Sequence, residues 1–460
     1  MNLPFLAIDR GTRLAISKRL IRLTVPITLT FVFIILSDTI DTVFSSQYDA
    51  TTLAAISVAT LIGILPLATA NGIAYTAVPL YSYLKQQNKP DEIFNLIVEF
   101  LIIGMTIGIV FSVLFIIGVP YTLKLIGVAP AIIPLVETYL TYLLPYILGM
   151  IAFNNFYYFS ESYGFPVFAT VTVLLSFCIK GLFIYLLVFS DFVQQSWGIA
   201  GFGLASVIFA WSKFLILLPI ILMYQNFRVI WHHPLQRLNL SPQRMWQNTK
   251  KGIPISLSYL SEWGAIMVMG LMLARLGVNE VGANGIVYSI MPLSLVIVTA
   301  LSRSIAILVA QHQDEHTLLK QTLTVGIMLA LGLLALICLA LILFSTLIMG
   351  LYKPSAELLQ LARSIYPYMI WVLLCLGLNN IFCFALKGLS DFFIVFVILF
   401  MTSWLIFIPL GYLLSSTPYL IEPQGIRGWW YALSLSTFIS ACLSGVRLRY
   451  LIKQRQPLPS

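Results

Sequence analysis

The sequence predicts an all-α integral membrane protein whose helices cross the bilayer twelve times, in two six-helix bundles. Three observations support this prediction. Of the 460 residues, 60% are hydrophobic and only 9% are charged, whereas soluble domains carry about 25% charged residues. Apolar runs of about 20 residues, the length needed to cross a bilayer as a helix, recur from end to end. Motifs of the first half also return, in the same order, in the second half.

Twelve apolar runs can be delimited along the chain. They cover approximately residues 21–46, 52–84, 93–118, 130–160, 166–190, 197–224, 253–275, 280–311, 317–349, 358–386, 391–414 and 426–448. No connection between these runs is long or polar enough to form a separate soluble domain. We therefore expect a multi-pass membrane protein with the lipid bilayer as its surroundings.

The repeated motifs indicate a duplicated six-helix unit. "PIT" (Pro26–Thr28), near the start of the first run, matches "PIS" (Pro254–Ser256), near the start of the seventh. Likewise, "FNNFYYF" (Phe153–Phe159) in the fourth run matches "LNNIFCF" (Leu378–Phe384) in the tenth. Because six is an even number of spans, both units insert the same way up. The two bundles should then be related by a pseudo-two-fold axis along the membrane normal, as in some secondary transporters.

The charge distribution predicts the domain boundaries and the orientation. We expect a first bundle over residues 1–224, a polar cytoplasmic linker over 225–252, and a second bundle over 253–460. Basic residues gather in the linker, near both ends and at alternate connections, whereas the opposite side holds only Lys124, Arg275, Lys353, Arg363 and Arg427. Cytoplasmic loops carry this excess, so both termini are expected in the cytoplasm. The net charge of +9 is therefore a topology signal and not a sign of nucleic-acid binding.

Several charged residues lie deep in the apolar runs, where a charge costs about 3 kcal/mol or more. Asp38 and Asp41 share one helical face, about 12 Å and 7 Å from the outer end of the first span. Glu262 lies about 15 Å inside the seventh span, near the bilayer midplane. These acids predict a cation or proton site, with interfacial hydration as the alternative for Asp41. Lys180 and Lys213 are equally deep. Lys180 can pair with Asp38 or Asp41, either as a static lock between helices or as part of coupling.

Amides and aromatic residues inside the fourth and tenth spans predict a second polar surface. They are Asn154, Asn155, Tyr157, Asn379 and Asn380. Such residues can stack on a planar ligand and form hydrogen bonds with it. The alternative is that the amides join neighbouring helices.

Catalytic motifs are absent from the sequence. It contains no phosphate-binding loop, no HExxH, no GxSxG and no paired Cys/His cluster. The five cysteines fall within apolar runs and are interpreted as small buried hydrophobic residues. We therefore expect no enzyme activity, no metal and no cofactor. Without a nucleotide site, any transport has to be driven by an ion gradient.

Four motifs resemble those of multidrug and toxic compound extrusion (MATE) transporters, most closely the bacterial drug/cation exchangers. They are "DTVFSSQYDATTLAAISVA" (Asp41–Ala59), "GIPISLSYLSEWGAI" (Gly252–Ile266), "PLSLVIVTALSRSIA" (Pro292–Ala306) and "GIAGFGLASVI" (Gly198–Ile208). The resemblance covers nearly the whole chain. It implies that Asp41 is a coupling group, that Glu262 is a second coupling or substrate-binding acid, and that Arg303 belongs to the same region.

Two departures from the family pattern concern the same regions. Leu376 stands where such exchangers often carry an aspartate in the tenth span. Lys180 and Ile184 replace an Asn-x-x-x-Asn pattern that supports the first aspartate. Because Lys180 can itself neutralise an acid, these changes favour protons over sodium as the coupling ion.

The predicted function is secondary active export. The chain is expected to exchange protons or sodium for small organic compounds, cationic or amphipathic, by alternating access. Asp41, Asp38, Lys180 and Glu262 are the expected coupling groups, and Glu262, Asn154, Asn155, Asn379, Asn380, Tyr157, Lys213 and Arg303 the expected substrate-binding residues. The alternative is a flippase for lipids or lipid-linked sugars, which Lys180 and Lys213 favour and the acids disfavour. A monomer in the bacterial inner (plasma) membrane is expected.

Overall fold

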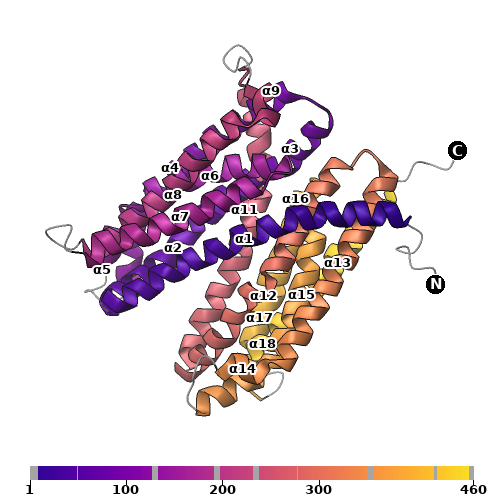
Figure 1. Ribbon diagram of the computed structural model, residues 1–460. Helices are drawn as coiled ribbons and strands as arrows, with labels where there is room; N and C mark the ends of the chain where they lie inside the picture. The colour runs from indigo at the N-terminus through magenta and orange to yellow at the C-terminus, as the bar shows by residue number, and fades with distance from the viewer. Residues whose placement is uncertain are drawn as a thin grey trace. The chain divides into compact units, whose positions relative to one another are not determined.

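The computed structural model describes residues 9–48, 50–126, 133–190, 197–231, 238–276, 278–350, 356–418 and 422–454. Helices dominate these ranges, and no strand occurs within them (Figure 1). The first set is α1 (Arg10–Tyr48), α2 (Ala50–Tyr75), α3 (Ala77–Gln86), α4 (Pro90–Ile126), α5 (Ile133–Leu140), α6 (Leu143–Ser162), α7 (Val167–Ile184), α8 (Gly198–Met223) and α9 (Arg228–Trp231). The second set is α11 (Pro242–Leu276), α12 (Val278–Gln311), α13 (His316–Leu343), α14 (Ser345–Gly350), α15 (Ala356–Gly388), α16 (Phe392–Phe400), α17 (Ile408–Ser416) and α18 (Ile426–Gln454).

Each predicted span coincides with one helix or with consecutive helical segments. Ten helices of the described chain are long and apolar enough to cross a membrane. The pair α5 and α6, bent by 41°, makes an eleventh if it is one span. The second predicted run coincides with α2 and α3, which are separated at Thr76. Wide π-helical turns at Tyr185–Phe189 and Met401–Phe407 interrupt two other spans. The predicted all-α membrane architecture is confirmed.

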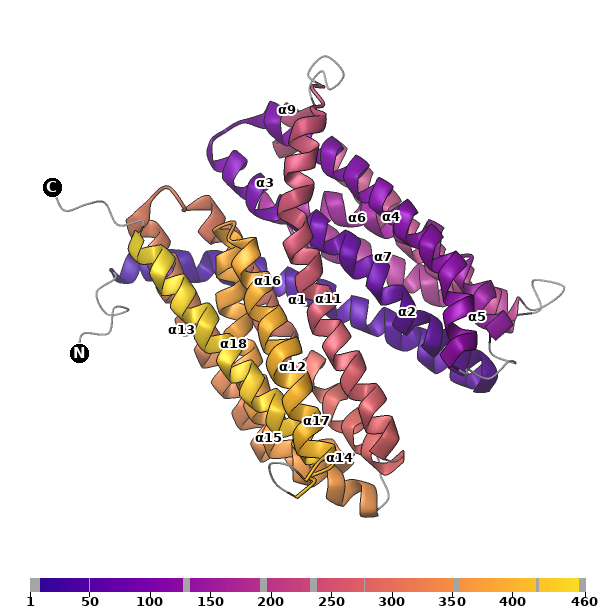
Figure 2. The ribbon, with the colours of Figure 1, turned by 180° about the vertical axis from the view of Figure 1, so that it is seen from behind.

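The helices form two compact units. Unit 1 consists of Met1–Thr28 and Leu257–Ser460, and unit 2 consists of Leu29–Ser256. The helices α1 and α11 therefore each contribute to both units. Within unit 1, α12, α15 and α18 pack side by side, as Figure 2 shows from behind.

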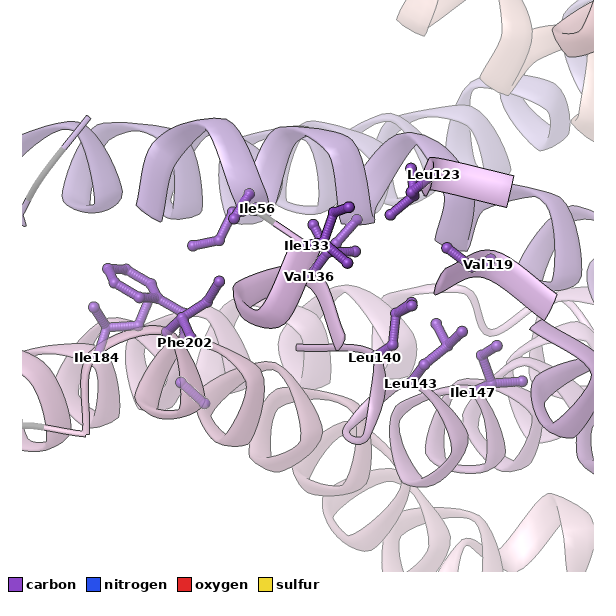
Figure 3. Packing of buried hydrophobic residues seen from close by; sticks show 14 of the residues in the cluster. Ile56, Val119, Leu123, Ile133, Val136, Leu140, Leu143, Ile147, Ile184 and Phe202 are labelled. Atoms are coloured by element: carbon purple, nitrogen blue, oxygen red, sulfur yellow. The ribbon is translucent and has the colours of Figure 1, made fainter. Parts of the chain in front are cut away.

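The core of unit 2 is apolar and joins α5 to its neighbours. Short α5 lies between the ends of longer helices, and its buried face contacts α2, α4 and α8 (Figure 3). The cluster includes Ile56, Val119, Leu123, Ile133, Val136, Leu140, Leu143, Ile147, Ile184 and Phe202. Burial of such side chains stabilises a membrane bundle through close packing, because lipid is as apolar as the side chains themselves.

The first part of α11 is held within unit 2 by close backbone packing. A Cβ atom on Gly72 of α2 would lie 2.5 Å from the Ser256 backbone, so only glycine permits this approach. At the same place the Ser256 hydroxyl donates to the Thr69 carbonyl oxygen at 2.7 Å. Small residues at helix crossings have this role in membranes.

A buried carboxylate on α4 also holds the start of α11, through an ion pair and a hydrogen bond. Glu99 of α4 is fully buried, and Arg244 lies 2.6 Å from its Oε1 atom. The Asn248 amide donates to the other carboxylate oxygen at 3.3 Å. We call Glu99, Arg244 and Asn248 the Glu99 clasp. A charge-assisted contact of this kind is stronger than a neutral hydrogen bond.

The first part of α1 is fastened within unit 1. Arg19 donates to the Gln311 side chain at 2.6 Å, and Thr24 donates to Ser304 at 3.0 Å. Both partners lie on α12. The His316 ring, at the start of α13, contacts the Ile452 carbonyl oxygen near the end of α18 at 3.3 Å. The first and last helices of the described chain therefore meet α12 and α13 at one end of unit 1.

Candidate functional site

The N-terminal spans contain a buried ion pair. Lys180 of α7 donates to Asp41 Oδ2 of α1 at 2.7 Å. It also donates to the Ser37 carbonyl oxygen at 2.9 Å and to the Ser37 hydroxyl at 3.2 Å. An ammonium group has three hydrogens, so these contacts use all of them. The structure thus selects Asp41 as the partner of Lys180, while the Asp38 side chain lies outside the described residues.

One oxygen of the Asp41 carboxylate takes no part in this ion pair. The Lys180 side chain is 3% exposed and that of Asp41 15% exposed. Asp41 Oδ1 is buried and has no hydrogen-bond partner among the described residues. A buried oxygen without a partner is costly. This atom is therefore a suitable place for a proton or for a donor group of a ligand.

A second buried lysine, Lys213, shares with Lys180 the neighbourhood of one aromatic ring, that of Phe209. The Lys213 ammonium is 4.1 Å from the ring centroid of Phe209, and the Lys180 ammonium is 5.2 Å from it. Lys213 also lies over Phe153 at 4.9 Å and donates to Met150 Sδ at 2.8 Å. Ring faces attract cations, more strongly where water is excluded. Sequence reasoning identified both lysines but missed Phe209, because nothing in its position distinguishes it from other apolar residues.

In unit 1, Glu262 is also accompanied by a lysine. The charge of Lys387, on α15, acts on Glu262 of α11. Lys387 is 4% exposed, and its ammonium lies 5.0 Å from the Tyr259 ring and 4.8 Å from the Phe384 ring. Lys387 directly follows the tenth predicted run, residues 358–386. It is buried because α15 continues to Gly388.

The amides of the fourth span join helices. The Asn155 amide donates to the Ile97 carbonyl oxygen at 2.8 Å, and its Oδ1 accepts from Tyr81 at 3.1 Å. Asn154 donates to the side chain of Asn71 on α2. These contacts agree with the helix–helix alternative. Tyr157 stacks on Phe153, with ring centroids 5.7 Å apart, which connects it to the surroundings of Lys213.

The amides of the tenth span join helices within unit 1, as those of the fourth span do in unit 2. Asn379 Oδ1 accepts from Ser440 at 3.1 Å and from Ser444 at 3.0 Å, both on α18. Asn380 donates to Thr299 of α12 at 3.3 Å. Arg303, also on α12, is buried. The predicted site residues thus divide between the two units, with Asp41 in unit 2 and Glu262 in unit 1.

The same pattern of two halves appears in a comparison with protein families. Residues 26–186 and residues 254–413 match the MatE family model. The chain belongs to the MatE family. The two matched stretches correspond to the two halves predicted from the repeated motifs of this MatE protein.

Named relatives match nearly the full length of this MatE protein. It is 23% identical over 446 residues to the probable multidrug resistance protein NorM of Shewanella oneidensis, covering 95% of this chain and 96% of the relative. It is 24% identical over 452 residues to the multidrug resistance protein NorM of Aliivibrio fischeri, covering 95% of each.

Solved structures share its fold. The Vibrio cholerae MATE transporter VcmN in the bent form matches with a TM-score of 0.81 at 17% identity, covering 97% of this chain and 99% of that one. A MOP superfamily transporter from Pyrococcus furiosus, described as having a binding pocket of reverse polarity that suggests a different function, matches with a TM-score of 0.79 at 15% identity, covering 97% of this chain and 98% of that one. The fold of two six-helix bundles is thereby confirmed.

Proposed function

We propose that this MatE protein is a proton-coupled antiporter that exports small organic compounds, cationic or amphipathic, by alternating access. The observation that carries the proposal is the buried Asp41–Lys180 pair with its open Asp41 Oδ1 atom. A proton on Oδ1 neutralises the carboxylate and removes the attraction that holds Lys180 to α1. The pair then has two states, and a ligand that binds one state better shifts the population towards it.

The Lys180 ammonium supports protons over sodium as the coupling ion. Hard cations such as metal ions prefer several oxygen ligands. At Asp41, an ammonium already lies 2.7 Å from one carboxylate oxygen, and it repels a second cation. A proton needs only the open oxygen. Asp38 remains a proposed member of this coupling group.

Glu262 is proposed as the second acid of the cycle. Lys387, whose charge acts on Glu262, lies within the same unit, so protonation or substrate binding at Glu262 changes its electrostatic interaction with that lysine. The residues proposed to contact substrate are Asn379, Asn380 and Arg303 in the same unit, and Asn154, Asn155, Tyr157 and Lys213 in the other. We also propose that the chain is a monomer in a bacterial inner membrane with both termini in the cytoplasm.

A second candidate is a flippase for lipids or lipid-linked sugars. The buried Lys180 and Lys213, both beside Phe209, favour an anionic headgroup. The reverse polarity reported for the Pyrococcus furiosus transporter makes this candidate worth testing within the same fold. Asp41 and Glu262 favour the antiporter.

Transport in proteoliposomes tests the two candidates. Export of a fluorescent organic cation or zwitterion is measured under an imposed proton gradient and, separately, a sodium gradient. Flipping of a fluorescent lipid is measured in the same preparation. We expect proton-driven export, lost in Glu262→Gln and Asp41→Asn but kept in Glu357→Gln, an exposed control on α15. Lipid flipping without export, or wild-type export by Glu262→Gln, would refute the proposal.

A further inference from the structure

The helices α1 and α11 carry matching stripes of exposed residues near their starts. The Arg22 stripe of α1 consists of Lys18, Arg22, Val25 and Leu29, and the Lys250 stripe of α11 consists of Trp246, Lys250, Ile253 and Leu257, each 228 residues later. Every one of these residues is exposed. Spacings of four, three and four residues place each set along one side of a helix. The duplicated chain therefore presents one kind of surface twice.

The opposite side of each helix packs against protein. In α1, Leu20, Leu23 and Ile27 are buried. In α11, a Cβ atom on Gly252 would lie 2.9 Å from the Cα atom of Ile73 on α2. Each stripe is thus the side of its helix that the described part of the chain leaves uncovered.

The basic residues of the stripes lie where membrane-spanning helix begins. From Arg22 to Ser45, and from Lys250 to Leu273, each candidate span continues for about 35 Å. The hydrocarbon core of a bilayer is about 30 Å thick, so both charges reach the headgroup layer. The apolar residues of each stripe follow one and two turns later, at the depth of the acyl chains.

The positive charges of the stripes are available to an anion. No ion pair within the described part of the chain joins Arg22 or Lys250 to a carboxylate. Each has a second exposed basic residue beside it, Lys18 one turn before Arg22 and Lys251 directly after Lys250. The Lys250 ammonium also lies 5.2 Å from the ring centroid of Trp246, a residue type that prefers the membrane–water interface.

We propose that the two stripes are docking sites for anionic phospholipids, one headgroup at Arg22 and one at Lys250. The lipid phosphate accepts charge-assisted hydrogen bonds from the basic side chain, and an acyl chain lies along the apolar residues that follow. Charge complementarity selects the lipid. Phosphatidylglycerol carries a net negative charge, whereas the phosphate of phosphatidylcholine is neutralised by its own ammonium. Basic residues at a membrane surface attract anionic lipid, by about fivefold in affinity for each residue.

Native mass spectrometry of the purified full chain tests the proposal. The protein in detergent is titrated with phosphatidylglycerol and, separately, with phosphatidylcholine of the same acyl chains. We expect two phosphatidylglycerol molecules to bind at least about fivefold more tightly than phosphatidylcholine. Equal affinity for the two lipids would overturn the proposal.

Variants assign the bound lipids to the stripes. Arg22→Gln and Lys250→Gln should each lose one tightly bound phosphatidylglycerol, and the double variant should lose both. Arg22→Lys, which keeps the charge, should retain its lipid, and it serves if the Gln variant does not fold. Lys89→Gln is the control, since Lys89 is exposed but lies 2.9 Å from Glu92. Unchanged binding in both Gln variants, or an equal loss in Lys89→Gln, would contradict the assignment.

A free anion is distinguished from a lipid by its lack of acyl chains. Ile253→Asn, which keeps Lys250, should weaken phosphatidylglycerol binding at the Lys250 stripe, because the acyl chain loses an apolar contact. Inorganic phosphate in excess should not displace the lipid. Displacement by inorganic phosphate, together with unchanged binding in Ile253→Asn, would show an anion site without a lipid requirement and would overturn the proposal.

Lipid docking is separable from transport. Neither Arg22 nor Lys250 belongs to the proposed coupling or substrate-binding groups. Binding of phosphatidylglycerol at both stripes in a protein that exports nothing would refute the antiporter and leave the docking sites intact. Proton-driven export by a protein that binds both lipids equally would do the reverse.

Discussion

Asp41 and Lys180 show how a membrane protein keeps two charges inside a bundle. Each compensates the other, and Lys180 is further satisfied by Ser37. Such a pair need not stabilise the fold relative to apolar residues, but breaking it from one side typically costs about 3–5 kcal/mol. The pair is therefore suited to a step in which one partner is neutralised and the other released.

A double-mutant cycle measures this coupling. Asp41→Asn and Lys180→Met are each expected to lower the free energy of unfolding by about 3 kcal/mol or more, and the double variant should recover most of the loss. Denaturation in detergent micelles gives the three values. The exposed pair Lys89–Glu92, with side chains 48% and 51% exposed, serves as the control and should show coupling below about 1 kcal/mol. Additive effects at Asp41 and Lys180 would contradict the buried pair.

His312 provides a pH-dependent contribution outside the spans. Its Nδ1 atom contacts the Thr322 hydroxyl at 2.9 Å. Burial, followed by the charge of Arg19, lowers its pKa from 6.5 to about 4. The folded protein therefore keeps His312 neutral at a pH where the unfolded chain already binds a proton. This contribution to stability is present above about pH 6.5 and is lost as the pH falls towards about 4.

Melting temperatures across that pH range test the role of His312. The wild type is expected to lose stability as the pH falls, and His312→Gln should lose less over the same interval because it has no group that titrates there. His316→Gln is a suitable control, since His316 lies at the start of the next helix. Equal pH profiles for wild type and His312→Gln would contradict the assignment.

The sequence could identify the deep charges but not all their partners. Asp41, Glu262 and Lys180 were recognisable because a charge in an apolar run is costly wherever it lies. The choice of Asp41 over Asp38 as the partner of Lys180 depends on side-chain geometry across two helices. Lys387 was missed because its burial depends on where α15 ends and what packs there.

At the scale of helices, the apolar runs predicted where the spans lie, but they did not predict where the helices within the spans are interrupted. The break at Thr76, the bend between α5 and α6, and the π-helical turn at Met401–Phe407 each lie within a run that was delimited as a single apolar span. Hydrophobicity alone gives no signal there, because helix and interruption are equally apolar. Kinks depend on local packing and backbone contacts.

The Glu99 clasp is expected to fasten the start of α11 to α4. Arg244→Ala leaves a fully buried carboxylate without its charge partner, which should cost about 3–5 kcal/mol. Glu99→Gln should be milder, because a neutral amide can still accept from Asn248. Thermal unfolding in nanodiscs measures both, with Lys89→Ala as an exposed control on the same helix region. Equal melting temperatures for Arg244→Ala and Lys89→Ala would show that the clasp is not a stabilising contact.

At the scale of the whole molecule, duplication is visible in sequence and in family matches, whereas the division into compact units is visible only in the structure. The repeated motifs predicted two six-helix bundles, and two stretches match the family model. No pattern in the sequence indicated that α1 and α11 would each contribute to both units. That arrangement depends on long-range contacts such as Arg19 with Gln311 and Ser256 with Thr69.

The distribution of basic residues predicts how the protein is oriented in the membrane. Because basic residues concentrate in the connection Gln225–Gly252 and near both ends of the chain, these segments should lie in the cytoplasm. Cys178 and Cys442 are exposed, so the expectation that all five cysteines are buried was wrong for these two. In a variant with both replaced by serine, Gln243→Cys should react with a membrane-impermeant maleimide only after the cells are permeabilised.

Ser416→Cys, at the connection after the eleventh predicted span, is the matched probe for the opposite side. Both Gln243 and Ser416 are exposed in the structure, so access to the reagent depends on the side of the membrane and not on burial. Ser416→Cys should be labelled in intact cells, because an odd number of spans separates it from a cytoplasmic N-terminus. Labelling of Gln243→Cys in intact cells, or failure to label Ser416→Cys there, would contradict the predicted orientation.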